Sequence, residues 1–263
     1  MSSTQRNILL RIQYDGTEFY GWQKQNHLRT VQGEIEKALH RLHKRPVYLL
    51  AAGRTDSGVH AVGQVVSFHT DMASIPAEKF AAALNSMLPR DVRIHSSRVV
   101  AFDFHATHHA VERCYRYYVY TANSPNPLLD RQRLRVHRQL DIPTLNAMAS
   151  CLIGQHDFSS LASRRDSESM VRTVYRAHWF CDNIGFVFEI AGGGFLWKMV
   201  RTIVGTMLGC LAYDDGIQRF QQILAARKRE TAGKTAPPHG LVFYYVQYPA
   251  AKLSPEPSYE ETV

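Results

Sequence analysis

Hydrophobic side chains recur with period two in some stretches of the first hundred residues and at helical spacing in others. Alternation predicts a half-buried strand, and recurrence every three to four residues predicts a helix with one buried face. We therefore expect strands at residues 7–16, 46–53, 62–70 and 91–100, and helices at residues 30–45 and 75–89. The side chains expected in the core are Ile8, Leu10, Ile12, Tyr14, Val31, Ile35, Leu39, Leu42, Phe80, Leu84, Met87 and Leu88.

The second half of the chain repeats this order of elements. We expect strands at residues 114–121, 171–181, 184–191 and 241–248, and helices at residues 142–154, 195–211 and 217–227. Two βαββαβ units in tandem predict an α+β fold of two ferredoxin-like halves with a mainly antiparallel sheet. The expected domains are residues 1–105 and 106–249. Residues 250–263 are polar and end in acidic side chains, so a disordered tail is expected there.

The amino-acid composition indicates a candidate binding partner. The 263 residues carry a net charge of +8 and a pI near 9.4, which favours a polyanion such as a nucleic acid, although a basic protein without such a partner is equally compatible. No apolar run of 18 residues predicts a membrane span, and the first residues do not resemble a signal peptide. The four cysteines, Cys114, Cys151, Cys181 and Cys210, form no C-x-x-C pair, which favours free thiols in a reducing cytoplasm over structural zinc.

An arginine and an aspartate stand two residues apart in GRTDSG, residues 53–58, where a predicted strand ends. Gly53 and Gly58 let the backbone bend sharply. In a cleft, Asp56 would be partly desolvated, and a guanidinium such as that of Arg54 would keep it ionised. A carboxylate held in this way is a candidate nucleophile or general base. On these residues alone, a surface turn in which Asp56 bonds only to backbone amides is the commoner arrangement.

The stretch GRTDSGVHAVGQVVSFHT at residues 53–70 resembles the signature of the tRNA pseudouridine synthase A family. Eight further stretches are similar to motifs of that family and follow in its order, from Tyr14 to about Tyr248. They are YDGTEFYGWQKQ, TVQGEIEKAL, LNSMLPRDV, FHA, RCYRYYVY, GQHDFSSL, FLWKMVR and TAPPHGL. Two positions depart from the family pattern: Thr107 stands where the family usually has an arginine, and Leu161 where an aromatic residue is common.

The resemblance implies an isomerase that converts uridine to pseudouridine in the anticodon arm of tRNA, at nucleotides 38, 39 and 40. It also implies a homodimer that needs no metal and no organic cofactor, with the active-site cleft between the two halves. Asp56 would be the catalytic nucleophile, Arg54 would help to turn the base out, Tyr115 would pack on it, and Arg201 would pair with Asp56. From the residues alone, Tyr115 is one of several tyrosines on a sheet face, and Arg201 can be a solvated helix residue.

Clusters of basic residues are expected to bind tRNA phosphates, although each cluster alone is more often a solvated face. The clusters are Arg41, Lys44 and Arg45; Arg131, Arg133, Arg135 and Arg138; Arg164 and Arg165; and Arg227, Lys228 and Arg229.

Other signals are weaker. The stretch FDFHATHH carries Asp103, His105, His108 and His109, but no second motif completes a metal site. The three glycines of residues 192–194 fit an anion site or a tight turn. No phosphate-binding glycine motif supports a nucleotide cofactor. A catalytically silent tRNA-binding module and a metal-dependent nuclease that uses Asp56 stay open as alternatives.

Overall fold

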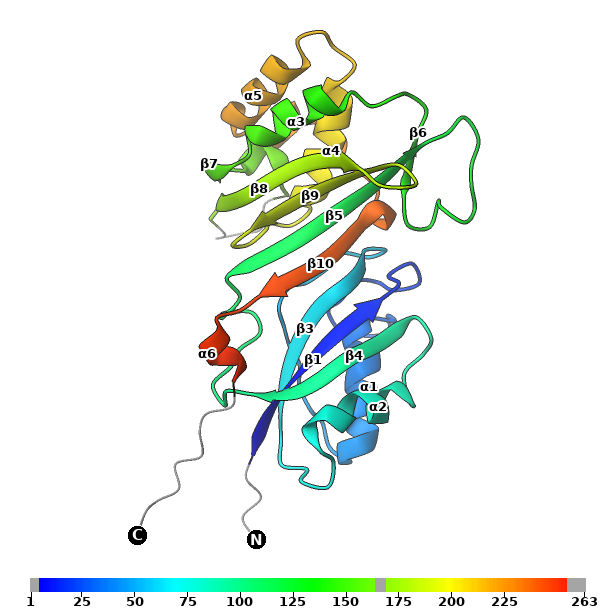
Figure 1. Cartoon of the computed structure of the whole chain (residues 1–263), viewed down its shortest axis with the longest axis vertical. Helices are drawn as coiled ribbons and strands as arrows, with labels where there is room; N and C mark the ends of the chain where they lie inside the picture. Colours follow the sequence, from blue (N-terminus) through cyan, green and yellow to red (C-terminus); the bar gives the residue numbers. More distant parts are fainter. Residues whose placement is uncertain (1–4, 164–168, 255–263) are drawn as a thin grey trace. The chain divides into compact units, whose positions relative to one another are not determined.

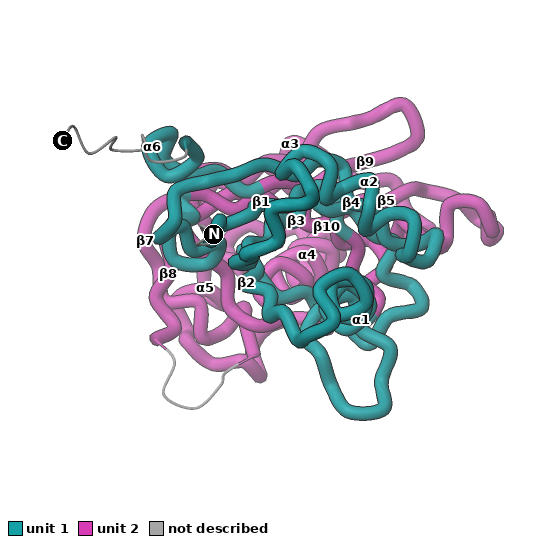
Figure 2. The backbone as a smooth tube through the Cα atoms, turned by 90° about the horizontal axis from the view of Figure 1, so that it is seen from below, with its two compact units in different colours: residues 1–57, 61–111, 246–263 teal, residues 58–60, 112–245 magenta. Residues whose placement is uncertain are grey.

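The computed structural model describes residues 5–163 and 169–254 (Figure 1). The chain forms two compact units (Figure 2). Unit 1 comprises residues 1–57, 61–111 and 246–263, and unit 2 comprises residues 58–60 and 112–245. No helix in the described ranges combines the length and the apolar character that a membrane span requires.

Unit 1 is built on a short antiparallel sheet. Its elements are β1 (Arg6–Tyr14), α1 (Val31–His43), β2 (Leu50–Ala51), β3 (His60–Thr70), the 3₁₀ helix η1 (Ala77–Lys79), α2 (Phe80–Asn85), β4 (Val92–Val100) and the short α6 (Ala250–Leu253). Strand β1 lies between β3 and β4 and is antiparallel to both, and β2 pairs with β3. The order βαββαβ is as predicted.

The core of unit 1 follows the predicted periodicity. Thr30 caps α1 by accepting a hydrogen bond from the amide of Gly33, and Lys44 ends the helix in the left-handed conformation. Val31, Ile35 and Leu39 are fully buried, as predicted, while Leu42 is only half-buried. Phe80 of α2 packs edge-on against Phe68 of β3 with 5.6 Å between ring centroids, so α2 covers this sheet.

Unit 2 contains a longer sheet and three main helices. Its elements are β5 (Glu112–Thr121), β6 (Leu134–Val136), α3 (Ile142–Ser150), β7 (Gly154–Asp157), η2 (Ser159–Leu161), β8 (Val171–Cys181), β9 (Phe186–Gly192), α4 (Met199–Cys210), α5 (Gly216–Ala226), η3 (Arg229–Thr231), η4 (Pro238–Gly240) and β10 (Leu241–Gln247). The strands follow the order β10-β5-β9-β8-β7, with β6 parallel to β5. Helices α3, α4 and α5 pack against one another.

The α+β class with a mostly antiparallel sheet is confirmed, and the individual elements differ from expectation in a few places. The predicted strand at 46–53 shrinks to β2, and the helix predicted at 195–211 begins only at Met199 because Lys198 adopts a left-handed conformation with φ of 59°. Strands β6 and β7 were not predicted. Part of the expected tail forms α6, and residues 255–263 lie outside the described residues.

Candidate active site

The candidate catalytic aspartate lies in the loop of residues 52–59, between β2 and β3. Within this loop Arg54 is exposed and Asp56 is half-buried, while Thr55 between them is buried. We call residues 53–57 the catalytic loop, after the role that the family resemblance implies for Asp56. Because Thr55 points into unit 1, it anchors the loop at the residue that separates the two candidate functional side chains.

Three neighbours hold the catalytic loop, one through a side chain and two through the backbone. The hydroxyl groups of Thr55 and Tyr14 share a buried hydrogen bond of 2.8 Å. The carbonyl of Thr55 accepts a hydrogen bond of 3.0 Å from the amide of Trp22, and the carbonyl of Gly53 accepts one of 2.8 Å from Gln64 Nε2. Burial raises the pKa of Tyr14 to about 12. Contacts from β1, from β3 and from the segment after β1 therefore fix the loop.

Gly21 makes the closest approach to the catalytic loop. Its φ of +85° lies in the left-handed region, which glycine adopts at little cost. A Cβ atom at this position would lie 2.8 Å from the carbonyl oxygen of Thr55 and 3.2 Å from the carbonyl carbon of Asp56. Both the backbone conformation and the lack of space therefore require glycine here.

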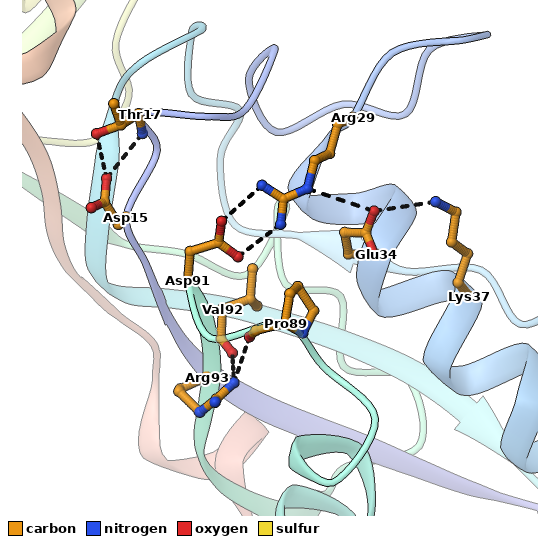
Figure 3. A network of polar contacts seen from close by, with 9 residues as sticks. All are labelled: Asp15, Thr17, Arg29, Glu34, Lys37, Pro89, Asp91, Val92 and Arg93. Atoms are coloured by element: carbon orange, nitrogen blue, oxygen red, sulfur yellow. Dashed lines mark hydrogen bonds and ion pairs between the residues drawn. The ribbon is translucent and has the colours of Figure 1, made fainter.

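The ion pair of Arg29 and Asp91, drawn in Figure 3, holds the segment between β1 and α1. This segment carries Gly21 and Trp22. The guanidinium of Arg29 donates two hydrogen bonds, of 2.8 and 2.9 Å, to the carboxylate of Asp91, just before β4. The carbonyl of Arg29 accepts from the amide of Tyr20, and the ring of Phe19 lies 4.2 Å from the guanidinium carbon. A bidentate pair of this kind fixes direction as well as distance, so it closes the segment between β1 and α1 onto the start of β4.

The other two candidate residues lie in unit 2. Tyr115 on β5 is 8% exposed, and its ring meets Phe195 and Phe243 edge-on, with centroids 5.1 and 4.9 Å away. Arg201 on α4 donates from Nε to the carbonyl of Ala236 at 2.8 Å, and the amide of Ala236 donates back to the carbonyl of Arg201 at 3.0 Å. Both side chains are thus oriented by neighbours within unit 2. The pairing of Arg201 with Asp56 stays a prediction.

The basic clusters differ in how their members are engaged. Arg41 and Lys44 are exposed at the end of α1, whereas Arg45 forms an ion pair of 2.7 Å with Asp71. Arg133, with 11% of its side chain exposed, forms a bidentate pair with Asp182, which also accepts two backbone amides in the β8–β9 turn. Arg133 is therefore committed to this turn rather than to a phosphate. Arg164 and Arg165 lie outside the described residues.

The weaker signals have structural explanations. Asp103 pairs with Lys252, and His105 Nδ1 accepts a hydrogen bond of 3.2 Å from the amide of Thr107. Burial lowers the pKa of His105. Within the described ranges, no group of three or more histidine, cysteine or acidic side chains is placed to hold a metal ion. The amide of Gly193 donates to the carbonyl of Thr173 on β8, so the first two glycines of the run continue the pairing of β9 with β8.

Sequence reasoning missed the residues that support the catalytic loop. The sequence alone assigns Tyr14 to the core and gives no role to Gly21, Gln64 or Asp91. All three of these residues stand in stretches similar to family motifs, which is the signal that could have identified them. Thr107, which replaces the family's usual arginine, donates a hydrogen bond of 2.6 Å to the carbonyl of Ala51, the last residue of β2.

Replacing Gly21 by alanine is expected to displace the catalytic loop. The added methyl group clashes with the Thr55 carbonyl and strains the backbone, so the free energy of unfolding should fall by about 1–3 kcal/mol. Urea unfolding measures this loss, and hydrogen–deuterium exchange at residues 53–57 should become faster.

Gly209→Ala is the matched control, because a Cβ there meets nothing within 4 Å in α4. It should leave exchange in the catalytic loop unchanged and raise stability by up to about 1 kcal/mol. Equal behaviour of the two variants would show that the approach of Gly21 does not support the loop.

Comparison with known proteins places the chain. A family model described as tRNA pseudouridine synthase matches residues 11–108 and 148–249. The tRNA pseudouridine synthase A of Treponema denticola is 43% identical over 263 residues, which cover 98% of each chain. The enzyme of that name from Acetivibrio thermocellus is 43% identical, and the match covers 92% of this chain and 100% of that enzyme. The enzyme of that name from Bacillus subtilis is 41% identical, and the match covers 90% of this chain and 97% of that enzyme. The matches thus span the catalytic loop, Tyr14, Gly21 and Arg201. The chain belongs to the tRNA pseudouridine synthase family, an isomerase family that converts uridine to pseudouridine in tRNA.

Proposed function

We propose that this protein converts uridine to pseudouridine in the anticodon arm of tRNA, at nucleotides 38, 39 and 40, with Asp56 as its catalytic carboxylate. The observation that carries the proposal is the construction of the catalytic loop. Its backbone is held at Gly53 and Thr55 and is closely packed by Gly21, while the side chain of Asp56 is only half-buried. A fixed backbone that leaves one carboxylate accessible favours a reaction that demands precise positioning.

The chemistry of the reaction needs little beyond such a carboxylate. The bond between ribose C1′ and uracil N1 breaks, a bond between C1′ and C5 forms, C5 loses a proton and N1 gains one. No electrons are gained or lost, so we expect no redox cofactor and, as the family resemblance implies, no metal. Asp56 can attack C1′, add to C6 of uracil or remove a ribose proton, and these three routes stay open. All three require an ionised carboxylate beside an extruded nucleotide.

Extrusion of the nucleotide has a free-energy cost that other side chains can offset. Turning a base out costs a few kcal/mol, and stacking on an aromatic ring recovers about 1–3 kcal/mol. We assign the stacking to Tyr115, whose ring is held by Phe195 and Phe243. The exposed Arg54 would help to turn the base out, and Arg201 would pair with Asp56 and keep it ionised.

The proposal extends to partners and location. The tRNA would bind through exposed cations such as Arg41 and Lys44, with Arg45 taking part if tRNA displaces Asp71. We expect a homodimer, as the resemblance implies, and sedimentation equilibrium tests it. A cytoplasmic location fits a tRNA-modifying enzyme. The alternative, a catalytically silent tRNA-binding module, is not favoured, because curated relatives with about 40% identity over most of the chain are named as synthases.

Replacing the carboxylate of Asp56 is expected to abolish turnover. Asp56→Asn keeps the size of the side chain and removes its negative charge, so an unmodified tRNA transcript should acquire no pseudouridine while it still binds. Chemical mapping of pseudouridine measures the first outcome, and a filter-binding titration measures the second.

Asp215→Asn is the matched control for this experiment. Asp215 is exposed at the start of α5 and pairs only on the surface with Arg219, so its replacement should leave both stability and turnover nearly unchanged. Measurable turnover by Asp56→Asn would end the assignment of Asp56. Absence of pseudouridine with the wild-type protein would end the proposed function.

The salt dependence of tRNA binding tests the proposed phosphate contacts. The affinity should fall steeply with salt, and in Arg41→Gln/Lys44→Asn the slope of log affinity against log salt should become shallower by about 1–2, since two phosphate contacts are lost. Asparagine is chosen because it tolerates the left-handed backbone of residue 44. Lys37→Gln, on the same helix and paired with Glu34, is the control and should leave the slope unchanged. An unaltered slope in the double variant would exclude these two contacts.

A further inference from the structure

One of the three tryptophans is exposed. Trp22 and Trp179 are 3% and 2% exposed, whereas Trp197 is 38% exposed. The ammonium nitrogen of the adjacent Lys198 lies 4.4 Å from the centroid of the indole ring. An accessible indole with a cation beside it matches the surfaces that bind single-stranded nucleic acid, where a base stacks on the ring and a cation meets the phosphate.

Trp197 lies two residues after Phe195, which contacts Tyr115, the proposed base-binding tyrosine. Phe195 contacts the ring of Tyr115 edge-on at 5.1 Å. Two residues of extended chain span at most about 7 Å, so the backbone of Trp197 lies within that distance of the backbone of Phe195. Leu196 between them is buried, and Lys198 reverses the chain with a φ of 59° before α4 begins. Phe195 therefore packs against Tyr115, and Trp197, two residues later, carries a partly exposed indole ring.

The segment from Gly193 to Lys198 has further aromatic and basic neighbours. The hydroxyl of the exposed Tyr175 lies 3.0 Å from the place where Gly193 would carry a Cβ, and Arg113 donates a hydrogen bond of 2.7 Å to the carbonyl of Gly193. Arg172 Nε lies 4.0 Å from the corresponding place at Gly194. These cations favour a polyanionic ligand over an apolar protein surface.

We propose that Trp197 and Lys198 bind an unpaired nucleotide of the tRNA substrate that neighbours the target uridine, the indole by stacking on its base and the ammonium group by contacting its phosphate. The proposal rests on the proposed function, because it needs Tyr115 to receive the target base. It adds a second stacking site, so that the strand is held at the target nucleotide and at one nucleotide beside it.

Tryptophan fluorescence tests the stacking directly. In Asp56→Asn, which should bind without turnover, titration with an unmodified tRNA transcript is expected to quench the emission, since a base stacked on Trp197 quenches the one exposed indole. Asp56→Asn/Trp197→Phe keeps only the two buried tryptophans and should lose most of the quenching. Equal quenching in both proteins would overturn the proposal.

Steady-state kinetics provide the second readout. Trp197→Ala should raise KM for tRNA by about tenfold or more with little change in kcat, and Trp197→Phe should restore most of the loss. Tyr213→Ala is the matched control. Tyr213 is 54% exposed, and the guanidinium carbon of Arg219 lies 4.1 Å from its ring centroid. It comes after the C-terminal end of α4, whereas Trp197 comes before the N-terminal end. It should leave KM unchanged. A Tm close to that of the wild type would show that Trp197→Ala is folded.

The outcomes separate this proposal from the proposed function. If Trp197→Ala forms pseudouridine with an unchanged KM, the stacking site is wrong while the role of Asp56 stands. If the wild-type protein forms no pseudouridine, the proposed function fails, and the quenching titration still decides whether Trp197 stacks on RNA.

Discussion

The catalytic loop depends on the buried hydrogen bond between Thr55 and Tyr14. A single bond of this kind contributes only about 1 kcal/mol to stability, but leaving either hydroxyl buried without a partner would cost about 1–3 kcal/mol. The main effect of the bond is therefore to restrict the conformation of the loop rather than to stabilise the fold. Because Thr55 stands between Arg54 and Asp56, fixing its side chain also fixes the backbone positions from which the side chains of Arg54 and Asp56 extend.

The same principle explains family-like motifs that hold no chemically active group. Gly21 and Trp22 support the catalytic loop, and the pair of Arg29 with Asp91 holds the segment that carries them. In unit 2, the ring of Phe195 contacts the ring of Tyr115 and helps to fix its orientation. Each support comes from a part of the sequence distant from the side chain that it positions. A loop that had to find its conformation with every substrate would lose much of the benefit of a preorganised site.

The sequence predicts those parts of the structure whose information is local. The inward side chains Ile8, Leu10, Ile12 and Tyr14 of β1 and the apolar stripe of α1 can be read from the sequence, and both are confirmed. Asn7 and Leu9, on the other side of β1, are buried as well, which the predicted half-buried strand did not include. The length of β2 depends on how far β3 accompanies it, so residues 46–53 alone could not show that only Leu50 and Ala51 pair.

The candidate site shows the same limit. Asp56 was identified because a motif surrounds it, whereas the supporting role of Tyr14 requires knowing that Thr55, 41 residues later, lies beside it. The sequence places Arg133 in a cluster expected to bind phosphates, because it cannot show that Asp182, 49 residues later, pairs with this arginine.

The net charge shows what such ion pairs leave for the tRNA. Each pair neutralises one positive and one negative charge, so the surplus of eight positive charges is unchanged. That surplus must rest on cations that no carboxylate of this chain neutralises. A tRNA needs such cations, because its affinity for a protein comes largely from the counterions that they release from its phosphates. The internal pairs thus decide which basic residues can serve the tRNA, while the overall composition decides that some of them must be left over to do so.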